Sequence, residues 1–249
     1  MLKKLLQPKF ILAFLLFVLL LGGGLYYWIS MSYGPAEEAL SYLETTSSYE
    51  VIEEEDYFAF LPVESQADRK AGMIFYPGGQ IRVESYAALA AELAERGYPV
   101  FLVQMPYELA ILGWSRAEDV VRDYPKISSW YLIGHSLGGA MAARFLNRKN
   151  PENFVGLIML GAYPAAADDI SGQDLQVLSI YGSEDQVMDK ELFRERKELL
   201  PPAARFVEIP GGNHAGFGQY GEQEGDGLAE ISFEKQLEQT VKAILDLLD

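Results

Sequence analysis

The sequence contains no cysteine and only two histidines, His135 and His214. The absence of cysteine excludes disulfide bonds, thiolate metal ligands and a cysteine nucleophile. With so few histidines, a multi-histidine zinc site is not expected, and we predict no metal. Any catalytic chemistry must therefore do without a thiol and with at most two imidazoles.

Basic residues are also scarce. The chain of 249 residues has 20 Lys and Arg against 36 Asp and Glu, which gives a formal net charge of −16. Three of the basic residues, Lys3, Lys4 and Lys9, belong to the first 30 residues, which contain no acid. The remainder is therefore more acidic still. Such a surface repels phosphate backbones, so we expect no nucleic-acid partner, and solubility is the simpler meaning of the acidity.

Residues 10–29, FILAFLLFVLLLGGGLYYWI, form the one long stretch without charge. At 1.5 Å per residue, 20 helical residues just span the hydrocarbon core of a bilayer. The three lysines before the stretch predict a cytoplasmic N-terminus, and Tyr26, Tyr27 and Trp28 occupy the place of an interfacial aromatic belt. We therefore expect a single-pass signal anchor in the cell membrane, with the rest of the chain outside the cytoplasm.

A cleavable signal peptide is the alternative reading of this segment. Its apolar core would usually be 7–15 residues long and would end in an A-x-A-like site. Here the core is longer, and residues 30–32 offer only a weak site, so secretion after cleavage remains the second possibility. The expected organisation is a transmembrane helix in residues 1–30, a linker or stalk in 31–48, and a catalytic domain in 49–249.

Strand-like and helix-like segments alternate through the rest of the chain. The strand-like segments are nearly continuous apolar runs, as a sheet covered on both faces requires. Strands are expected within 49–63 (two), 71–76, 99–106, 130–133, 154–162, 175–185 and 204–212. Helices are expected at 86–97, within 107–124, at 137–149 and 189–200, and at the C-terminus, where Leu237, Val241, Ile244, Leu245 and Leu248 share a face. This pattern predicts an α/β fold with a doubly wound, mostly parallel sheet.

Residues 134–138, Gly-His-Ser-Leu-Gly, lie between a predicted strand and a predicted helix. A serine hydroxyl is a poor nucleophile unless an adjacent base activates it and its oxygen stands clear of the backbone. The glycines allow a bend tight enough to lift Ser136 above the sheet, which is the context that the G-x-S-x-G motif requires. An ordinary glycine-rich turn would satisfy the motif alone, but the flanking strand and helix favour a nucleophile.

The other catalytic partners are expected in the chain order Ser, acid, His. Asp185 follows one predicted strand and His214 follows the next, so both should lie at the same sheet edge as Ser136. His214 would accept the serine proton, and Asp185 would fix the imidazole tautomer. Glu184 and Asp189 are rival acids, and Asp185 could instead cap a helix. His135, beside the nucleophile, is expected to point away from Ser136 as a packed, hydrogen-bonded histidine.

Acyl transfer also needs two N–H groups that stabilise the negatively charged oxygen of the intermediate. The N–H of Leu137, at the start of the predicted helix, is one candidate. The second is expected in FYPGGQ, residues 75–80, where Pro77 cannot donate. Gly79 is our choice, with Gly78 and Gln80 as alternatives.

By these residues the chain resembles the α/β-hydrolase superfamily over roughly residues 50–249, and most closely its compact dienelactone-hydrolase-like or carboxylesterase-like bacterial members. The resemblance implies a serine hydrolase that cleaves an ester-like acyl bond of a small molecule through an acyl-enzyme, with no cofactor. It assigns Ser136, Asp185 and His214 as the triad and the N–H groups of Leu137 and Gly79 as the oxyanion hole.

The sequence also bears on a cap domain, on the pocket residues and on alternative functions. Only residues 163–174 fill the gap where family members insert a cap, so no large cap domain is expected. Met105, Tyr107, Leu109 and Phe217 are candidate pocket residues for a modest apolar acyl group. An acyltransferase or perhydrolase on the same triad, or a non-catalytic binding protein on the same fold, are the alternative functions.

Overall fold

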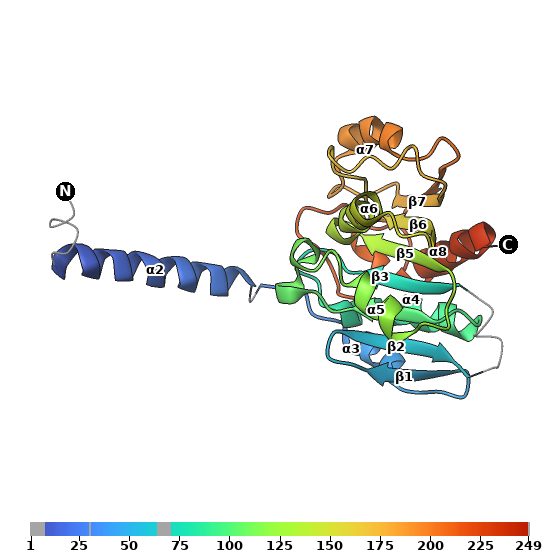
Figure 1. The fold of residues 1–249 in the computed structure, drawn as a ribbon, viewed down its shortest axis with the longest axis horizontal. Coiled ribbons are helices and arrows are strands. Elements are labelled where there is room, and N and C mark those ends of the chain that lie inside the picture. The colour runs from blue at the N-terminus through green and yellow to red at the C-terminus, as the bar shows by residue number, and fades with distance from the viewer. Residues whose placement is uncertain (1–7, 30, 64–70, 249) are drawn as a thin grey trace.

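A single mixed sheet of eight strands organises the chain in the computed structural model, which describes residues 8–29, 31–63 and 71–248 (Figure 1). The strand order is β1-β2-β4-β3-β5-β6-β7-β8. The strands are β1 (Tyr49–Glu53), β2 (Tyr57–Pro62), β3 (Gly72–Tyr76), β4 (Val100–Val103), β5 (Trp130–His135), β6 (Phe154–Leu160), β7 (Gln176–Gly182) and β8 (Arg205–Ile209). Each expected strand is therefore found.

The strands from β3 to β8 are parallel, whereas β1 and β2 form an antiparallel edge. From β3 the chain moves outward to β4 on one side and then crosses back to β5 on the other. Such a reversal of direction opens a crevice beyond the carboxyl ends of the strands. The loops that follow β3 and β5 both reach this crevice, which places the glycine-flanked serine there.

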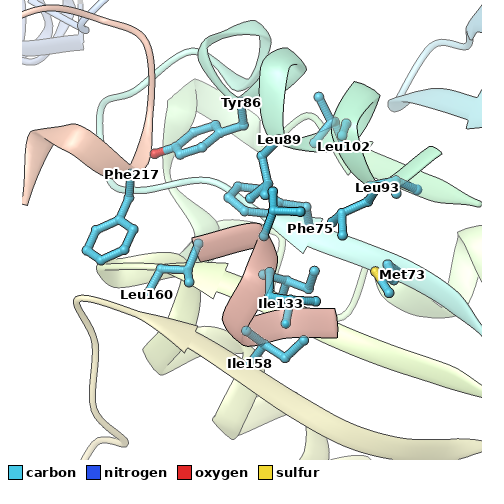
Figure 2. Close-up of a cluster of buried hydrophobic side chains, with 14 of the residues drawn as sticks. Met73, Phe75, Tyr86, Leu89, Leu93, Leu102, Ile133, Ile158, Leu160 and Phe217 are labelled. Atoms are coloured by element: carbon cyan, nitrogen blue, oxygen red, sulfur yellow. The ribbon is translucent and has the colours of Figure 1, made fainter. Parts of the chain in front are cut away.

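Helices cover both faces of the sheet, as the apolar strands require. Helices α4 (Ala87–Glu95) and α8 (Phe233–Leu248) pack on one face, and α5 (Ala117–Asp123) and α6 (Leu137–Lys149) pack on the other. Successive strand residues pack in the two hydrophobic cores in turn. Met73 and Phe75 pack in the core on the α4 side (Figure 2), and Ile74 packs in the core on the α6 side. Helix α7 (Lys190–Arg196) docks through Phe193, whose ring lies 4.9 Å from that of Tyr181.

The connections between these elements bear on two expectations. Residues 161–175, between β6 and β7, are all described and contain neither helix nor strand, so no cap is inserted there. The helix expected within 107–124 begins only at Ala117. Tyr107 and Glu108, which precede it, have φ values of 54° and 53°, in the left-handed region that an α-helix cannot use.

The N-terminal part of the chain consists of helix α2 (Pro8–Ile29), which extends away from the sheet in Figure 1, and a short segment that joins the domain. Large apolar side chains of α2, from Phe10 to Leu21, are exposed. In the part of the chain that the structure describes, no helix is long and apolar enough to cross a membrane. Lys3 and Lys4 and the side chains of Tyr27 and Trp28 lie outside the described residues. The transmembrane role of residues 10–29 therefore stays a prediction.

The segment after α2 contacts the domain directly. Helix α3 (Glu37–Leu40) and a short 3₁₀ turn (Ser41–Leu43) lie in the range where a linker or stalk is expected. Ala39 is fully buried, and Tyr33 forms a parallel bridge with Ile81, in the loop after β3. Residues within the range 31–48 thus pack on the sheet domain.

Candidate active site

Ser136 is the single residue of the sharp turn between β5 and α6. Its φ of 51° and ψ of −121° are unfavourable for a residue with a Cβ, at a cost of ~1–2 kcal/mol. The turn is held in part because Ser136 N–H donates to Leu160 O at 2.9 Å. A Cβ on Gly134 would lie 2.5 Å from the Gly138 carbonyl, and one on Gly138 would lie 2.2 Å from Tyr76 O. The motif glycines are therefore required by close approaches of the main chain.

Asp185 lies in the loop after β7 and is fully buried. One carboxylate oxygen accepts from the main-chain N–H groups of Val187 (3.0 Å) and Met188 (2.8 Å). The other is 2.8 Å from Nδ1 of His214. These three hydrogen bonds fix the orientation of the carboxylate.

The two rival acids have different partners. Asp189 caps α7 by accepting from the N–H groups of Glu191 (2.9 Å) and Leu192 (3.0 Å). Glu184 accepts from the Ser183 hydroxyl at 2.8 Å. Among the three acids considered from the sequence, only Asp185 contacts His214 in the described structure.

His214 follows β8 and is 1% exposed. In the neutral tautomer whose Nδ1–H donates to Asp185, Nε2 carries no proton and can act as an acceptor. In the described part of the chain Nε2 has no hydrogen-bond partner, so a Ser136–His214 hydrogen bond is not formed in this conformation. Both residues nevertheless line one cavity of about 280 Å³. Such contacts commonly tighten only when substrate binds.

Hydrogen bonds in the loop after β3, residues 77–80, leave only one of the three candidates free, within the described structure, to act as the second oxyanion donor. Gly78 N–H donates to the Tyr86 hydroxyl at 3.1 Å, and Gln80 N–H donates to Glu108 O at 2.8 Å. Gly79 N–H has no partner among the described residues. A Cβ on Gly79 would lie 3.1 Å from the side chain of Leu137, so the two candidate donors are neighbours. The geometry thus favours Gly79 over both alternatives.

His135 is buried and hydrogen-bonded, and it is not paired with an acid. The Tyr86 hydroxyl lies 2.8 Å from its Nδ1, and because Gly78 N–H donates to the same oxygen, the Tyr86 hydrogen is available for His135. The His135 ring is 4.5 Å from the ring of His214 and 5.7 Å from that of Phe217. Burial, and secondarily the nearby His214, hold the pKa of His135 well below its usual value. A neutral His135 therefore braces Tyr86 and, through it, Gly78.

Two supports of the acid–histidine pair are not evident from sequence patterns. Asp226, in the long loop after His214, accepts from Ala215 N–H (2.8 Å) and Gln186 N–H (3.2 Å), which joins the histidine loop to the acid loop. Gly161 follows β6 with φ +52°, and a Cβ there would lie 2.9 Å from His214 Nδ1. An acidic residue in an acidic loop carries no local signal of this role, and neither does a glycine outside the motif.

The candidate pocket residues lie apart from the cavity at Ser136. Met105 lines a separate cavity of about 430 Å³, which Pro77 also lines. Tyr107 is 62% exposed, Leu109 is half-buried, and Phe217 packs beside His135. The residues that share the Ser136 cavity with His214 are Leu137, Ala140, Gly161, Ala162, Tyr163, Val187 and Met188. In the described residues, no cluster of three or more His, Asp or Glu has a metal-binding arrangement.

A mostly parallel sheet with a strand–serine–helix elbow, and an acid and a histidine carried by later strand ends, defines the α/β-hydrolase class of fold. The chain belongs to the alpha/beta hydrolase family, whose sequence profile matches residues 72–238. None of the curated proteins compared matches the sequence.

Solved structures share this fold at low sequence identity. A predicted CIB-like hydrolase from Thermoplasma acidophilum is 18% identical with a TM-score of 0.56, covering 80% of this chain and 97% of that one. A putative lipase from Acinetobacter baumannii AYE is 12% identical with a TM-score of 0.59, covering 85% and 94%. Naproxen esterase from Bacillus subtilis is 13% identical with a TM-score of 0.52, covering 78% and 92%.

Proposed function

We propose that this protein is a serine hydrolase that cleaves an uncharged carboxylic ester through an acyl-enzyme, with Ser136, His214 and Asp185 as its triad. The observation that carries the proposal is the 2.8 Å bond between Asp185 and Nδ1 of His214, which leaves Nε2 unpaired at the wall of the cavity that Ser136 also lines. A buried imidazole held in one tautomer beside a strained serine is suited to general-base catalysis.

The reaction begins when Nε2 of His214 accepts the proton of the Ser136 hydroxyl as Oγ attacks the carbonyl carbon of the ester. The carbonyl oxygen becomes an oxyanion, which the N–H groups of Leu137 and Gly79 stabilise, aided by the N-terminal field of α6. His214 then gives its proton to the leaving alcohol as the C–O bond breaks. Water attacks the acyl-serine by the same route and releases the acid and free Ser136.

The cavity supports a substrate group that is small and uncharged. At about 280 Å³, it lies near the lower end of ordinary ligand pockets, which run from ~300 Å³. Its walls include the side chains of Leu137, Val187 and Met188, and among the described residues no Lys or Arg lines it. An acyl chain with a carboxylate would therefore enter without a counter-charge, which burial makes costly. Short, neutral acyl groups are the expected preference.

The test uses the full-length protein in detergent. A fluorophosphonate probe should label wild type on the peptide that contains Ser136, and a p-nitrophenyl ester series should show turnover that falls as the acyl chain lengthens. Ser136→Ala should abolish both, and Ser128→Ala, a change at an exposed serine, should alter neither. Labelling that persists in Ser136→Ala would overturn the assignment of the nucleophile.

We further propose that α2 anchors the enzyme in the cell membrane with the domain outside the cytoplasm. Support comes from the 20 uncharged residues 10–29, the three lysines before them, and the exposed apolar side chains of α2. The protein should stay in the membrane fraction after alkaline carbonate and leave it in detergent. Recovery of a shortened chain in the medium would favour signal cleavage instead.

A further inference from the structure

The loop that carries Gly79 is held in an unfavourable conformation. Gln80 has φ 57°, which costs a residue with a Cβ ~1–2 kcal/mol. Two hydrogen bonds hold Gln80 there, one at each side of the residue. Its N–H donates to Glu108 O at 2.8 Å, and its carbonyl accepts from Tyr33 N–H at 2.7 Å. Gly79 directly precedes Gln80 in the same short loop, so the conformation of Gln80 constrains where the main chain of Gly79 lies.

Tyr33 lies beside the loop like one residue of an added strand. In addition to its bond to Gln80, its carbonyl accepts from Arg82 N–H at 3.0 Å, which completes the parallel bridge at Ile81. The residue is only four positions beyond the end of α2 at Ile29. The chain that enters the domain from α2 therefore runs directly along the loop after β3.

Tyr33 is itself fixed from the opposite side by the loop that follows His214. Its ring centroid is 5.6 Å from that of Tyr220, and its hydroxyl accepts from Glu224 N–H at 3.1 Å. Three residues later, Ala36 N–H donates to Gln219 O at 2.8 Å. Tyr33 thus lies between the loop of Gly79 and the loop of His214, and contacts both.

From this placement we propose that Tyr33 is a positioning residue of the oxyanion hole. Its main-chain N–H holds Gln80 in the left-handed conformation, and Gln80 in turn aims the N–H of Gly79 at the oxyanion formed on Ser136. The inference rests on the proposed function, because it concerns the same reaction. It assigns a role in the reaction to a segment that sequence patterns indicate is a stalk.

The decisive variant is Tyr33→Pro in the full-length chain, because proline lacks the N–H that donates to Gln80. We expect kcat for a p-nitrophenyl ester to fall about 10- to 100-fold with KM changed less than about twofold, since removal of a whole oxyanion donor costs ~10²–10³ in kcat. The inhibition constant of a trifluoromethyl ketone, which forms an oxyanion on the serine, should rise in proportion. Tyr26→Phe, at an exposed tyrosine of α2, leaves every bond of Tyr33 in place and should retain wild-type kcat.

The outcomes separate the two proposals. A wild-type protein without Ser136-dependent turnover would overturn the proposed function and this inference with it. An active wild type, with kcat and ketone inhibition unchanged in Tyr33→Pro, would overturn the inference alone. If Tyr33→Pro does not fold, the α-hydroxy-acid analogue of tyrosine at position 33 replaces the N–H by oxygen without a ring constraint. The same kcat loss is expected there, and unchanged kcat in that protein would equally refute the role.

Discussion

Substitution of Gly161 by alanine is the sharpest test of how the acid and the histidine are held. Gly161 has φ +52°, and a Cβ would lie 2.9 Å from His214 Nδ1 and 3.0 Å from Asp185 Oδ2, whereas ordinary contact begins at 3.4 Å. The new methyl group would lie beside this hydrogen bond and too close to both bonded atoms. Asp185 cannot turn easily, because Val187 and Met188 hold its other oxygen. The imidazole must therefore move by about 0.5 Å, the difference between 2.9 and 3.4 Å.

The expected effect on catalysis follows from that displacement. A misplacement of 1 Å can cost ~10²-fold in rate, so Gly161→Ala should lower kcat ~10- to 100-fold, which is ~1.4–2.7 kcal/mol of activation free energy. The positive φ adds ~1–2 kcal/mol of destabilisation, which shifts Tm by ~2–8 °C in a domain of this size.

Alanine substitutions at two other glycines separate the effect of the steric contact with His214 from the effect of the positive φ. Gly221 also has a positive φ (+84°) but no atom within 4 Å of an added Cβ, and Gly172 has neither a positive φ nor a close neighbour. Gly221→Ala should lower Tm as Gly161→Ala does and leave kcat near wild type, and Gly172→Ala should change neither. Steady-state hydrolysis of a p-nitrophenyl ester and thermal unfolding measure both. If kcat of Gly161→Ala equals that of Gly221→Ala, the steric reasoning is refuted.

Three further changes address the surroundings of the site. Asp226→Asn replaces an acceptor oxygen by a donor that faces main-chain N–H groups, so we expect a ~10-fold lower kcat and a Tm loss of ~5 °C. The exposed Glu230→Gln should change neither quantity. Equal behaviour of the two variants would contradict the role of Asp226 in joining the loops of His214 and Asp185. Tyr86→Phe leaves the N–H of Gly78 and Nδ1 of His135 unpaired, so unfolding in urea should show a loss of ~1–3 kcal/mol for each group. The pKa of His135 is lowered in the folded state, so between that pKa and ~6.5 the unfolded chain binds a proton at His135 that the folded chain does not bind. The free energy of unfolding should therefore fall as the pH drops below ~6.5, by up to ~1.4 kcal/mol per pH unit. His135→Gln should remove that part of the slope, and an unchanged pH profile would count against a buried neutral imidazole.

The sequence predicts the fold and the turn that carries Ser136 well because their signals are local. The apolar runs and turn formers marked every strand, and the helix after Ser136 begins and ends as expected, at Leu137 and Lys149. The family and the mostly parallel sheet are confirmed. The triad roles stay predictions, although Asp185 and His214 lie 2.8 Å apart across 29 residues of sequence.

What the sequence could not resolve depends on partners distant along the chain. The choice among Gly78, Gly79 and Gln80 is narrowed only by Tyr86 and by the carbonyl of Glu108. No periodicity or motif predicts the position of that carbonyl, because Glu108 has a positive φ and lies in an irregular loop.

The same limit applies to the pocket and the linker. Candidate pocket residues were inferred from their apolar character after β4 and after His214, but side-chain direction in irregular loops has no sequence signature. The contacts of Tyr33 are mostly made by main-chain atoms, which every residue type possesses. Residues 31–48 therefore give no compositional sign that they pack against the loop after β3.

Both imidazoles of the chain lie at one place, with ring centroids 4.5 Å apart. A spectrum of the protein labelled only at histidine would therefore contain two ring systems, and each would report on the active centre without overlap from elsewhere. Tautomer and protonation of both rings could be followed in the unmodified protein, with and without an added ester. The scarcity of histidine thus gives this protein an intrinsic magnetic-resonance probe that needs no engineered label.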